Sequence, residues 1–432
     1  MNTNIKSEIL DWARNFYTCK QKQDTEREFT KERTLNKRGV LWLGQTCNLR
    51  CFFCYFTNKI NDKDHPEHKF MSLDKAKEIC FKLKTVYGNE YVDIQGGEPT
   101  IYPPIYELIE YCNSIGLRPT LITNAIVLSD EKKCRRYKEA GISDFLVSTH
   151  ALGEVFDNIV GLKGGSELQL KGLYNIQKLG IPFRLNCTLT EQALAQIPEL
   201  SQMAIETGAR VVNFISFNPF ADQQGVSREN VPRYATIKSA LSKYIDLLET
   251  AGIEVNVRYL PLCMLASKHR KNIYDFQQLP YDQHEWDYNS WTWTTRFNQR
   301  SSSDEIDETI PILLYDVPSY NGVDFGKASE HGTKEHYMRE IDIKEHLIRL
   351  FSSGLPKEVI YRQNARLRAE KHCGYVYGEQ CAECSVKSIC DGFHSDYAQT
   401  FGTEEAKPIK FAKPVDDPKH YISKQKKIVI KD

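Results

Sequence analysis

Three cysteines lie within eight residues of each other in the segment CNLRCFFC. They are Cys47, Cys51 and Cys54, spaced C-x3-C-x2-C. Cysteine thiolates are the usual ligands of iron–sulfur clusters, and a cubane cluster takes four ligands, one per iron. Zinc is the alternative, but a structural zinc site is closed by four protein ligands, and no further cysteine or histidine follows until His65. The spacing therefore favours an iron–sulfur cluster with one iron open to a ligand from outside the chain.

A second group of cysteines stands near the C-terminus. Cys381, Cys384 and Cys390 form a C-x2-C-x5-C run, with Cys373 before it and His394 after it. An iron–sulfur cluster would suit these thiols, and so would zinc, because a C-x2-C pair with a third cysteine and a histidine closes a tetrahedral site. The remaining cysteines are scattered through helical or strand patterns and are expected to be small buried side chains: Cys19, Cys80, Cys112, Cys134 and Cys187.

The first cysteine group directly follows a short apolar run, which opens a region of alternating strand and helix patterns. Predicted strands are Val40–Gly44, Tyr91–Gln95, Pro119–Thr123, Phe145–Ser148, Phe183–Thr188, Val211–Ser216 and Ile253–Tyr259. Predicted helices are Ser72–Tyr87, Pro104–Ile115, Asp130–Ala140, Leu168–Leu179, Glu191–Thr207 and Arg233–Ala251. Such alternation calls for parallel strands with helical crossovers. We expect an α/β fold with a partial (β/α)6 barrel of the TIM type over residues 39–260, whose chemistry lies at the carboxyl ends of the strands.

The flanking regions have different compositions. Residues 1–38 are expected to form an amphipathic helix over 3–20 and an exposed charged segment from Lys20 to Arg38. Residues 261–400 are expected to form a small cysteine-rich domain and 401–432 a basic tail, which is expected to be solvated from Pro418 onward. The 57 basic and 57 acidic residues balance, which weakens a nucleic-acid-binding interpretation. The sequence shows neither an apolar run of membrane-spanning length nor a signal-like N-terminus, so a cytoplasmic location is expected.

The first cysteine motif, with Phe53 before and Tyr55 after its last cysteine, resembles that of the radical S-adenosylmethionine (SAM) superfamily. The resemblance implies that Cys47, Cys51 and Cys54 hold a [4Fe–4S] cluster whose open iron chelates SAM. One electron from the cluster then cleaves SAM, and the resulting 5′-deoxyadenosyl radical abstracts hydrogen from a substrate. The cofactors carry the difficult chemistry, and the protein binds and orients them.

Other strand ends carry further motifs of this family. Gly96-Gly97-Glu98-Pro99 is similar to its GGEP motif, which engages the methionine amino group; Thr123-Asn124 resembles TNG, and Ser148-Thr149-His150 resembles SLHG. Ala125 and Ala151 stand where those last two motifs have glycine, which makes the local backbone geometry a question. The resemblance implies the following SAM-binding residues: Phe53, Tyr55, Gly96, Gly97, Glu98, Pro99, Thr123, Asn124, Ser148 and Asn186.

Three polar residues near the strand ends are candidates for catalysis or substrate binding: His150, Glu154 and Ser216. A capping or satisfied polar role is the alternative for Ser216 and for Asn186. Asp157 is interpreted as an acid favoured by a helix N-terminus.

The second cysteine group resembles the SPASM or twitch extension of radical SAM enzymes, which holds auxiliary [4Fe–4S] clusters. The resemblance implies one such cluster here, with Cys263, Cys381, Cys384 and Cys390 as ligands and Cys373 as the alternate to Cys263. His394 is expected to form hydrogen bonds rather than bind metal. A zinc-stabilised module remains the alternative for this region.

The expected function is that of a radical SAM enzyme that oxidises its substrate with the help of the auxiliary cluster. A small molecule such as a sugar, nucleotide or amino acid derivative is favoured, with a flavodoxin or ferredoxin as reductant. One alternative is a redox-neutral rearrangement. Another is a peptide-modifying maturase, for which the segment Trp286–Trp293 would grip the peptide. A third, of another class, is a non-catalytic iron–sulfur electron-transfer protein.

Overall fold

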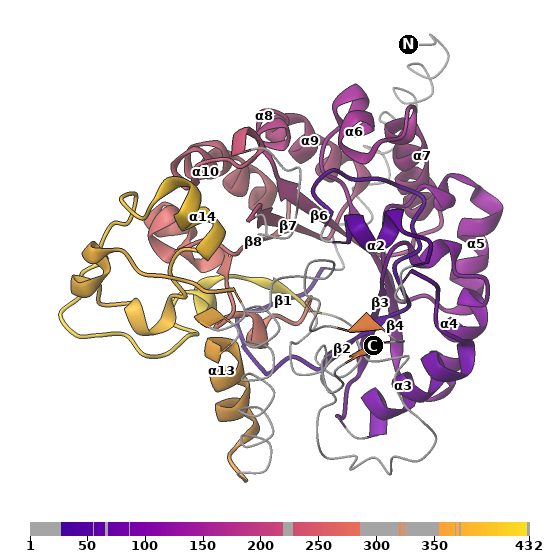
Figure 1. Ribbon diagram of the computed structural model, residues 1–432, viewed down its shortest axis with the longest axis horizontal. Coiled ribbons are helices and arrows are strands. Elements are labelled where there is room, and N and C mark those ends of the chain that lie inside the picture. Colours follow the sequence, from indigo (N-terminus) through magenta and orange to yellow (C-terminus); the bar gives the residue numbers. More distant parts are fainter. Residues whose placement is uncertain are drawn as a thin grey trace.

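A parallel sheet of eight strands forms the body of the molecule. The computed structural model describes residues 27–54, 56–64, 68–85, 87–218, 228–285, 319–320, 323–324, 354–367, 369–370 and 373–429. The strands follow one another in chain order as β2 (Arg38–Trp42), β3 (Tyr91–Gln95), β4 (Arg118–Thr123), β5 (Asp144–Ser148), β6 (Phe183–Leu189), β7 (Val211–Ser216), β8 (Glu254–Arg258) and β9 (Ile273–Tyr274). The sheet is curled, its edge strands β2 and β9 are not paired with each other, and helices line its convex side (Figure 1). The expected partial barrel is confirmed, with the short strand β9 in addition to the predicted ones.

The predicted crossover helices lie close to their expected positions, and two further ones, Thr57–Asn61 and Gly153–Val160, were not predicted. They are α2 (Thr57–Asn61), α3 (Leu73–Thr85), α4 (Ile105–Ser114), α5 (Glu131–Ala140), α6 (Gly153–Val160), α7 (Gly165–Lys178), α8 (Glu191–Ala195), α9 (Ile197–Thr207) and α10 (Tyr234–Thr250). The bounds of α5 show how the sequence sets them. Asp130 accepts hydrogen bonds from the backbone N–H groups of Lys132 and Lys133, and Gly141 ends the helix in the left-handed conformation. The prediction of one helix over Glu191–Thr207 was wrong, because the helical conformation is interrupted at Gln196, between α8 and α9.

One face of the sheet points into the barrel. Near the amino ends of the strands, this face is covered by paired charged side chains. Arg184 of β6 lies 3.5 Å from the Asp93 carboxylate of β3, although these strands are not neighbours, so both side chains point inward. Arg38, the first residue of β2, donates to the same carboxylate at 2.9 Å and is only 1% exposed. The prediction that the segment up to Arg38 is exposed was therefore wrong at its end, because a buried Asp93 requires a cationic partner.

Near the carboxyl ends of the strands, the side chains on the same face are less buried. Trp42, Gln95, Asn186 and Ile215 share the inward alternation with Asp93 and Arg184, and all four are partly exposed, whereas their strand neighbours on the helix side are buried. The barrel is thus packed at the amino ends of its strands and more open at their carboxyl ends, where the sequence motifs lie.

The segment after Pro418 was expected to be solvated, and this was wrong for its last strand. β12 (Lys427–Ile428) pairs antiparallel with β1 (Phe29–Thr30). Lys427 is 1% exposed and its Nζ lies 2.5 Å from Glu254 and 2.6 Å from Asp282. These two carboxylates are themselves fully buried, so they draw a lysine out of water.

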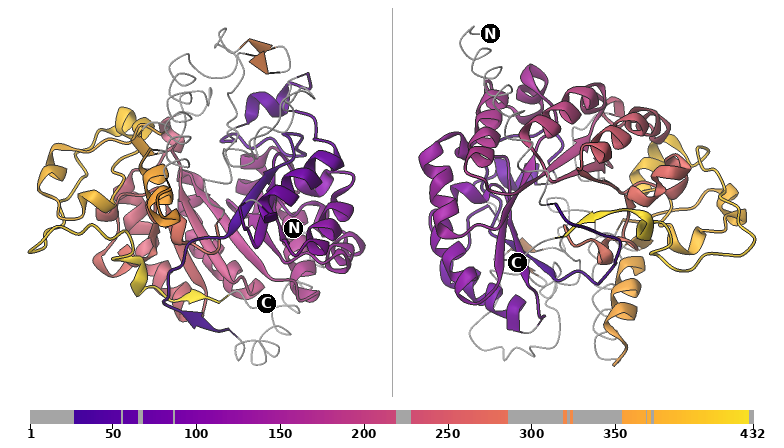
Figure 2. Two further views of the ribbon diagram at one scale, coloured as in Figure 1. Left: turned by 90° about the horizontal axis from the view of Figure 1, so that it is seen from below. Right: turned by 180° about the vertical axis from the view of Figure 1, so that it is seen from behind.

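The cysteine-rich C-terminal segment packs on the β8 side of the sheet, away from α3, α4 and α5 (Figure 2). It contains α13 (Lys357–Leu367) and α14 (Ser395–Phe401). Tyr397 of α14 stacks on Tyr234 of α10 with ring centroids 3.6 Å apart, and Phe393 and Ile389 join the same apolar core as the barrel.

Two sequence predictions, the helix over 3–20 and the aromatic segment Trp286–Trp293, lie outside the described residues. A short antiparallel pair, β10 (Ser319–Tyr320) and β11 (Val323–Asp324), lies between α10 and α13 in the sequence. Among the helices in the described ranges, none combines the length and the apolar character needed to cross a membrane.

Candidate active site

The loop with the first three cysteines follows β2 and is anchored on the end of α6. The backbone N–H of Arg50 donates to the carbonyl of Val160 at 2.9 Å, and that of Phe52 donates to Ile159 at 3.1 Å. Carbonyls in the last turn of a helix lack partners within the helix, so the loop satisfies them. Leu49 packs on Ile159 and Val160 in a small apolar cluster. The loop is therefore held by hydrogen bonds and apolar contacts rather than by the cysteines themselves.

The three thiols are well suited to a metal cluster. Burial raises the pKa of each, that of Cys47 to about 12, and the nearby Glu98 carboxyl adds to the effect on Cys47. Backbone N–H groups point at two of the sulfurs, from Leu49 to Cys47 and from Phe56 to Cys54, each at 3.4 Å. Thiolates are disfavoured in such a buried site unless a metal charge balances them, and N–H donors to sulfur are a feature of iron–sulfur sites. The donor set thus fits a cluster.

The GGEP loop lies directly against the start of the cysteine loop. Gly97 N–H donates to the Gly44 carbonyl at 2.8 Å, and Glu98 N–H donates to Thr46 at 2.9 Å. A Cβ at Gly97 would lie 2.1 Å from the Thr46 carbonyl oxygen, and one at Gly96 would lie 2.3 Å from that of Gly44. The two backbones approach so closely that only glycine fits at both positions. The Pro99 that follows begins a short 3-10 helix, Pro99–Ile101.

The Glu98 carboxylate joins the ends of β3 and β4. It is 1% exposed and accepts hydrogen bonds from Thr100 N–H (2.9 Å), the Thr100 hydroxyl (2.5 Å), the Thr123 hydroxyl (2.7 Å) and Asn124 N–H (2.8 Å). These four hydrogen bonds support a role for Glu98 in positioning Thr123 and Asn124. Direct contact of Glu98 with a methionine amino group stays a prediction.

Asn124 connects this network to the cysteine loop, because its side-chain amide donates to Asn48 at 2.8 Å. The next residue, Ala125, has φ +60°, which is the left-handed conformation that a glycine would adopt. The alanine that stands in place of the motif's glycine therefore adopts a backbone conformation that favours glycine, at a steric cost. Ala151, the second departure, is not among the residues with positive φ.

His150 lies behind the cysteine loop as a neutral side chain. Its Nδ1 accepts a hydrogen bond from Thr188 N–H at 3.1 Å, and its ring meets Phe53 edge-on, with centroids 4.7 Å apart. Burial lowers the pKa of His150 to about 4, so near neutral pH the proton stays on Nε2. His150 is thus poised as a hydrogen-bond donor rather than as a source of protons.

The other predicted residues occupy different environments. Ser148 ends β5 and pairs in register with Asn186 of β6, whose Oδ1 is buried without a hydrogen-bond partner. Ser216 ends β7 and is 1% exposed. Glu154 is exposed in the first turn of α6. Tyr55 lies outside the described residues.

The four favoured auxiliary cysteines line one pocket: Cys263, Cys381, Cys384 and Cys390. Cys263 lies just after β8, and the Ile409 N–H donates to the Cys384 sulfur at 3.4 Å. Burial raises the pKa of Cys263, Cys381 and Cys390. The charged residues that line this pocket are both cations, Lys387 and Lys407. Thiols with cations around them suit an anionic iron–sulfur cluster.

Cys373 lies elsewhere, in an apolar cluster with Phe276 and Tyr375. The structure therefore brings Cys263, not Cys373, to the other three cysteines. His394 Nδ1 accepts from Asp396 N–H at 3.3 Å and caps α14. In the part of the chain that the structure describes, no three His, Cys, Asp or Glu side chains are gathered as ligands of a single metal ion.

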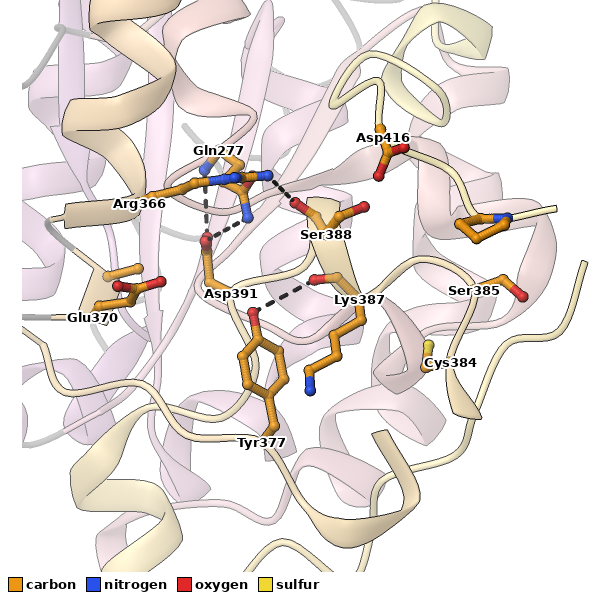
Figure 3. A pocket seen from close by; sticks show the side chains of 12 residues that line it. Gln277, Arg366, Glu370, Tyr377, Cys384, Ser385, Lys387, Ser388, Asp391 and Asp416 are labelled. Atoms are coloured by element: carbon orange, nitrogen blue, oxygen red, sulfur yellow. Dashed lines mark hydrogen bonds between the residues drawn. The ribbon is translucent and has the colours of Figure 1, made fainter. Parts of the chain in front are cut away.

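Sequence reasoning did not identify a pocket of about 400 Å³ beside the auxiliary cysteines (Figure 3). Arg366 of α13 donates to the Ser388 carbonyl at 2.8 Å and to the Gln277 side chain at 3.2 Å, while Gln277 donates to Asp391 at 3.1 Å. Cys384 and Tyr377 also line it. These residues are far apart in sequence and show no local motif, so only the fold reveals them.

Comparison with known proteins bears on the first site. Residues 43–200, which include the three cysteines, GGEP and the ends of β4 and β5, match the family model of the radical SAM superfamily. Residues 43–200 thus form a domain of the radical SAM superfamily. Its members use a [4Fe–4S] cluster and SAM.

Similarity to individual radical SAM proteins is partial. The chain is 30% identical over 180 residues to the Fe-coproporphyrin III synthase of Methanosarcina barkeri, covering 41% of this chain and 43% of that protein. It is 27% identical over 222 residues to a probable GTP 3′,8-cyclase of Sulfurisphaera tokodaii, covering 50% and 67%. It is 27% identical over 172 residues to the PqqA peptide cyclase of Bradyrhizobium diazoefficiens, covering 39% and 43%. The matched region thus spans about half of these relatives' length.

A solved structure is also similar. Streptococcus suis SuiB bound to S-adenosylmethionine matches 52% of this chain and 50% of its own, with 19% identity and a TM-score of 0.44.

Proposed function

We propose that this chain is a catalytic radical SAM enzyme in which Cys47, Cys51 and Cys54 hold the [4Fe–4S] cluster. When bound, the cluster and SAM supply reductive cleavage of SAM to a 5′-deoxyadenosyl radical, which abstracts hydrogen from the substrate. The observation that carries the proposal is the contact between the three-thiol loop and the GGEP loop, which only glycines permit. It joins a cluster site to the strand ends that bind SAM in this superfamily.

The chain's own residues have the following roles in this proposal. Gly96, Gly97 and Pro99 shape the loop that receives the methionine end of SAM, and Glu98 holds Thr123 and Asn124 in place. Phe53, Ser148 and Asn186 line the SAM site, and Tyr55 is proposed as a further member from its motif. His150, as a neutral Nε2 donor, is proposed to face the substrate, and Glu154 is retained as a more remote candidate. Ser216 follows the inward-facing Ile215 and is buried on the helix side of β7, so it is not proposed for this role.

We further propose that Cys263, Cys381, Cys384 and Cys390 hold an auxiliary [4Fe–4S] cluster that accepts an electron from the substrate radical. The shared pocket and its two lysines support this assignment. Net oxidation of a small molecule follows from it, and two of the relatives are named for small molecules, Fe-coproporphyrin III and GTP. A flavodoxin or ferredoxin is the class of electron donor that we expect.

The test is anaerobic reconstitution with iron and sulfide, followed by SAM and dithionite. We expect 5′-deoxyadenosine to form, and the Cys47/Cys51/Cys54→Ala variant to form none. About eight irons and no zinc per chain would support two clusters, whereas about four irons with one zinc would support a zinc-stabilised C-terminal module. If the wild-type protein makes no more 5′-deoxyadenosine than the variant, the enzyme proposal is wrong and a non-catalytic electron-transfer role replaces it.

A peptide is the second candidate substrate, favoured by the similarity to PqqA peptide cyclase. Small-molecule extracts and peptide pools can be compared, in deuterated buffer, as sources of a species that takes up deuterium from the solvent or loses mass during turnover. A redox-neutral product, equal in mass to its substrate, would favour rearrangement or epimerisation over oxidation.

A further inference from the structure

One face of α7 is built to hold the loop that follows β4. Gln169, Gly172 and Asn175 are spaced three residues apart and contact this loop in succession. The Asn175 amide donates to the carbonyls of Leu128 (2.8 Å) and Ser129 (3.0 Å). A Cβ at Gly172 would lie 2.5 Å from the Ala125 carbonyl oxygen. We call these three residues the α7 buttress.

Gln169 makes the contact nearest to the SAM site. It is 2% exposed, and its Nε2 donates to the carbonyl of Asn124 and to that of Ser148, both at 2.9 Å. One side-chain amide thus ties the end of β4 to the end of β5. An apolar side chain of similar size would fill the same space but take this donor away from the carbonyls of Asn124 and Ser148.

The buttress is also connected to the cysteine loop from two directions. Asn124, whose carbonyl accepts from Gln169, donates through its side chain to Asn48. At the other end, Asp157 of α6 accepts from Gly164 N–H (2.6 Å) and Ser166 N–H (2.8 Å) at the start of α7. Because the last carbonyls of α6 accept from Arg50 and Phe52, the cysteine loop, α6, α7 and the β4 loop form a closed circuit of hydrogen bonds.

We propose that Gln169 is a positioning residue for SAM, which sets the spacing between the β4 and β5 ends relative to the cysteine loop. The hydrogen bonds of its side chain go to the carbonyls of Asn124 and Ser148 and not to the cysteines proposed to hold the cluster. Its loss is therefore expected to weaken SAM binding while leaving cluster assembly intact. The inference rests on the proposed function, in which Glu98 holds Asn124 in place and Ser148 lines the SAM site.

The experiment compares Gln169→Leu and Gln169→Glu with Gln177→Leu. Gln177 lies on the same helix, but its amide donates at 3.3 Å to the carbonyl of Glu206, outside the site. Each protein is reconstituted anaerobically, its iron is counted, and its dissociation constant for SAM is measured by equilibrium dialysis at pH 6 and pH 8. We expect Gln169→Leu to bind SAM about tenfold more weakly, equivalent to about 1.4 kcal/mol, with wild-type iron content, and Gln177→Leu to match the wild type.

Gln169→Glu provides a readout that a packing defect would not give. A buried carboxyl has a raised pKa, and once protonated it can again donate one hydrogen bond. We expect its SAM affinity, relative to the wild type, to improve from pH 8 to pH 6, whereas that of Gln169→Leu does not. Because the two pH values are compared in the same variant, Gln169→Glu still tests the inference if Gln169→Leu fails to fold.

Wild-type SAM affinity in Gln169→Leu with full iron would overturn the inference, and so would a Gln169→Glu affinity that does not respond to pH. Equal loss of iron and of SAM binding in Gln169→Leu would also overturn it, by showing a general defect. Failure of the wild-type protein to hold iron or bind SAM would instead overturn the proposed function.

Discussion

Replacing Ala125 by glycine tests whether its left-handed backbone is strained, and Ala151 provides a matched control. Both alanines are fully buried, and each follows a motif residue at a strand end. They differ in backbone conformation, since Ala125 has φ +60° and Ala151 is not among the residues with positive φ. Alanine→glycine at the two sites therefore removes the same methyl group from different conformations.

The expected magnitudes follow from three effects. Removing a buried methyl costs about 0.8 kcal/mol, and the added freedom of glycine in the unfolded chain costs about 0.5–1 kcal/mol. At Ala125 alone, relief of the left-handed conformation returns about 1–2 kcal/mol. We expect Ala151→Gly to lower the free energy of unfolding by about 1–2 kcal/mol, and Ala125→Gly to change it by less than about 1 kcal/mol in either direction.

Urea unfolding of the cluster-free proteins under reducing conditions, followed by circular dichroism, measures this difference. Unchanged m-values would show that the compared states are the same. SAM affinity after reconstitution should be retained in Ala125→Gly, because glycine adopts the required backbone freely. Equal destabilisation of the two variants would refute the reasoning, since it would mean that the positive φ of Ala125 carries no strain.

Three further predictions concern single side chains. Lys427→Met should lower the free energy of unfolding by about 3–5 kcal/mol, because it removes the buried cation that Glu254 and Asp282 share and leaves them only His284 and Arg258 as partners. Urea unfolding against Lys426→Met, an exposed neighbour, checks this. Cys263→Ala should reduce the iron content from about eight toward about four per chain, whereas Cys373→Ala should keep it, as determined by iron analysis. In His150→Gln, the free energy of unfolding should fall less than in the wild type as the pH is lowered from 6.5 to 4. The folded-state pKa of His150 is lowered to about 4, so in this window the unfolded chain binds the extra proton and the wild type loses about 1.4 kcal/mol per pH unit.

Each of these predictions has an outcome that contradicts it. A Lys427→Met protein as stable as Lys426→Met would mean that the two acids are not charged in the folded state. Loss of iron in Cys373→Ala but not in Cys263→Ala would reverse the ligand assignment. Wild-type and His150→Gln stability curves that stay parallel from pH 6.5 to pH 4 would show that His150 is not held neutral.

Local apolar patterns were sufficient to locate most of the barrel. β3 and β7 have the bounds predicted from sequence, because each is an apolar run ended by polar motif residues. α6 was not predicted, since its eight residues are too few for a clear helical period. β9 was missed because only two residues pair. Long, periodic or sharply bounded segments are thus predictable, and short ones depend on tertiary contacts.

The site shows the same division between local and distant information. The spacing of Cys47, Cys51 and Cys54 is readable from the sequence alone. The choice between Cys263, which was favoured, and Cys373 could not be settled from spacing, because Cys373 is the nearer to Cys381 in sequence and only folding brings the distant Cys263 beside it. The burial of Arg38 and Lys427 was unpredictable for a similar reason, since each is explained by an acid on a distant segment.

The pairing of β1 with β12 has a consequence for biosynthesis. Phe29 faces Ile428, and Val429 N–H donates to the Glu28 carbonyl at 2.8 Å, so one of the earliest described segments to leave the ribosome waits for one of the last. Until Lys427 arrives, Glu254 and Asp282 have to remain hydrated or share other cations, and the amino-end layer of the barrel stays incomplete. β12 must therefore be synthesised before this barrel can finish folding, and until then the amino ends of the barrel strands must stay accessible to it.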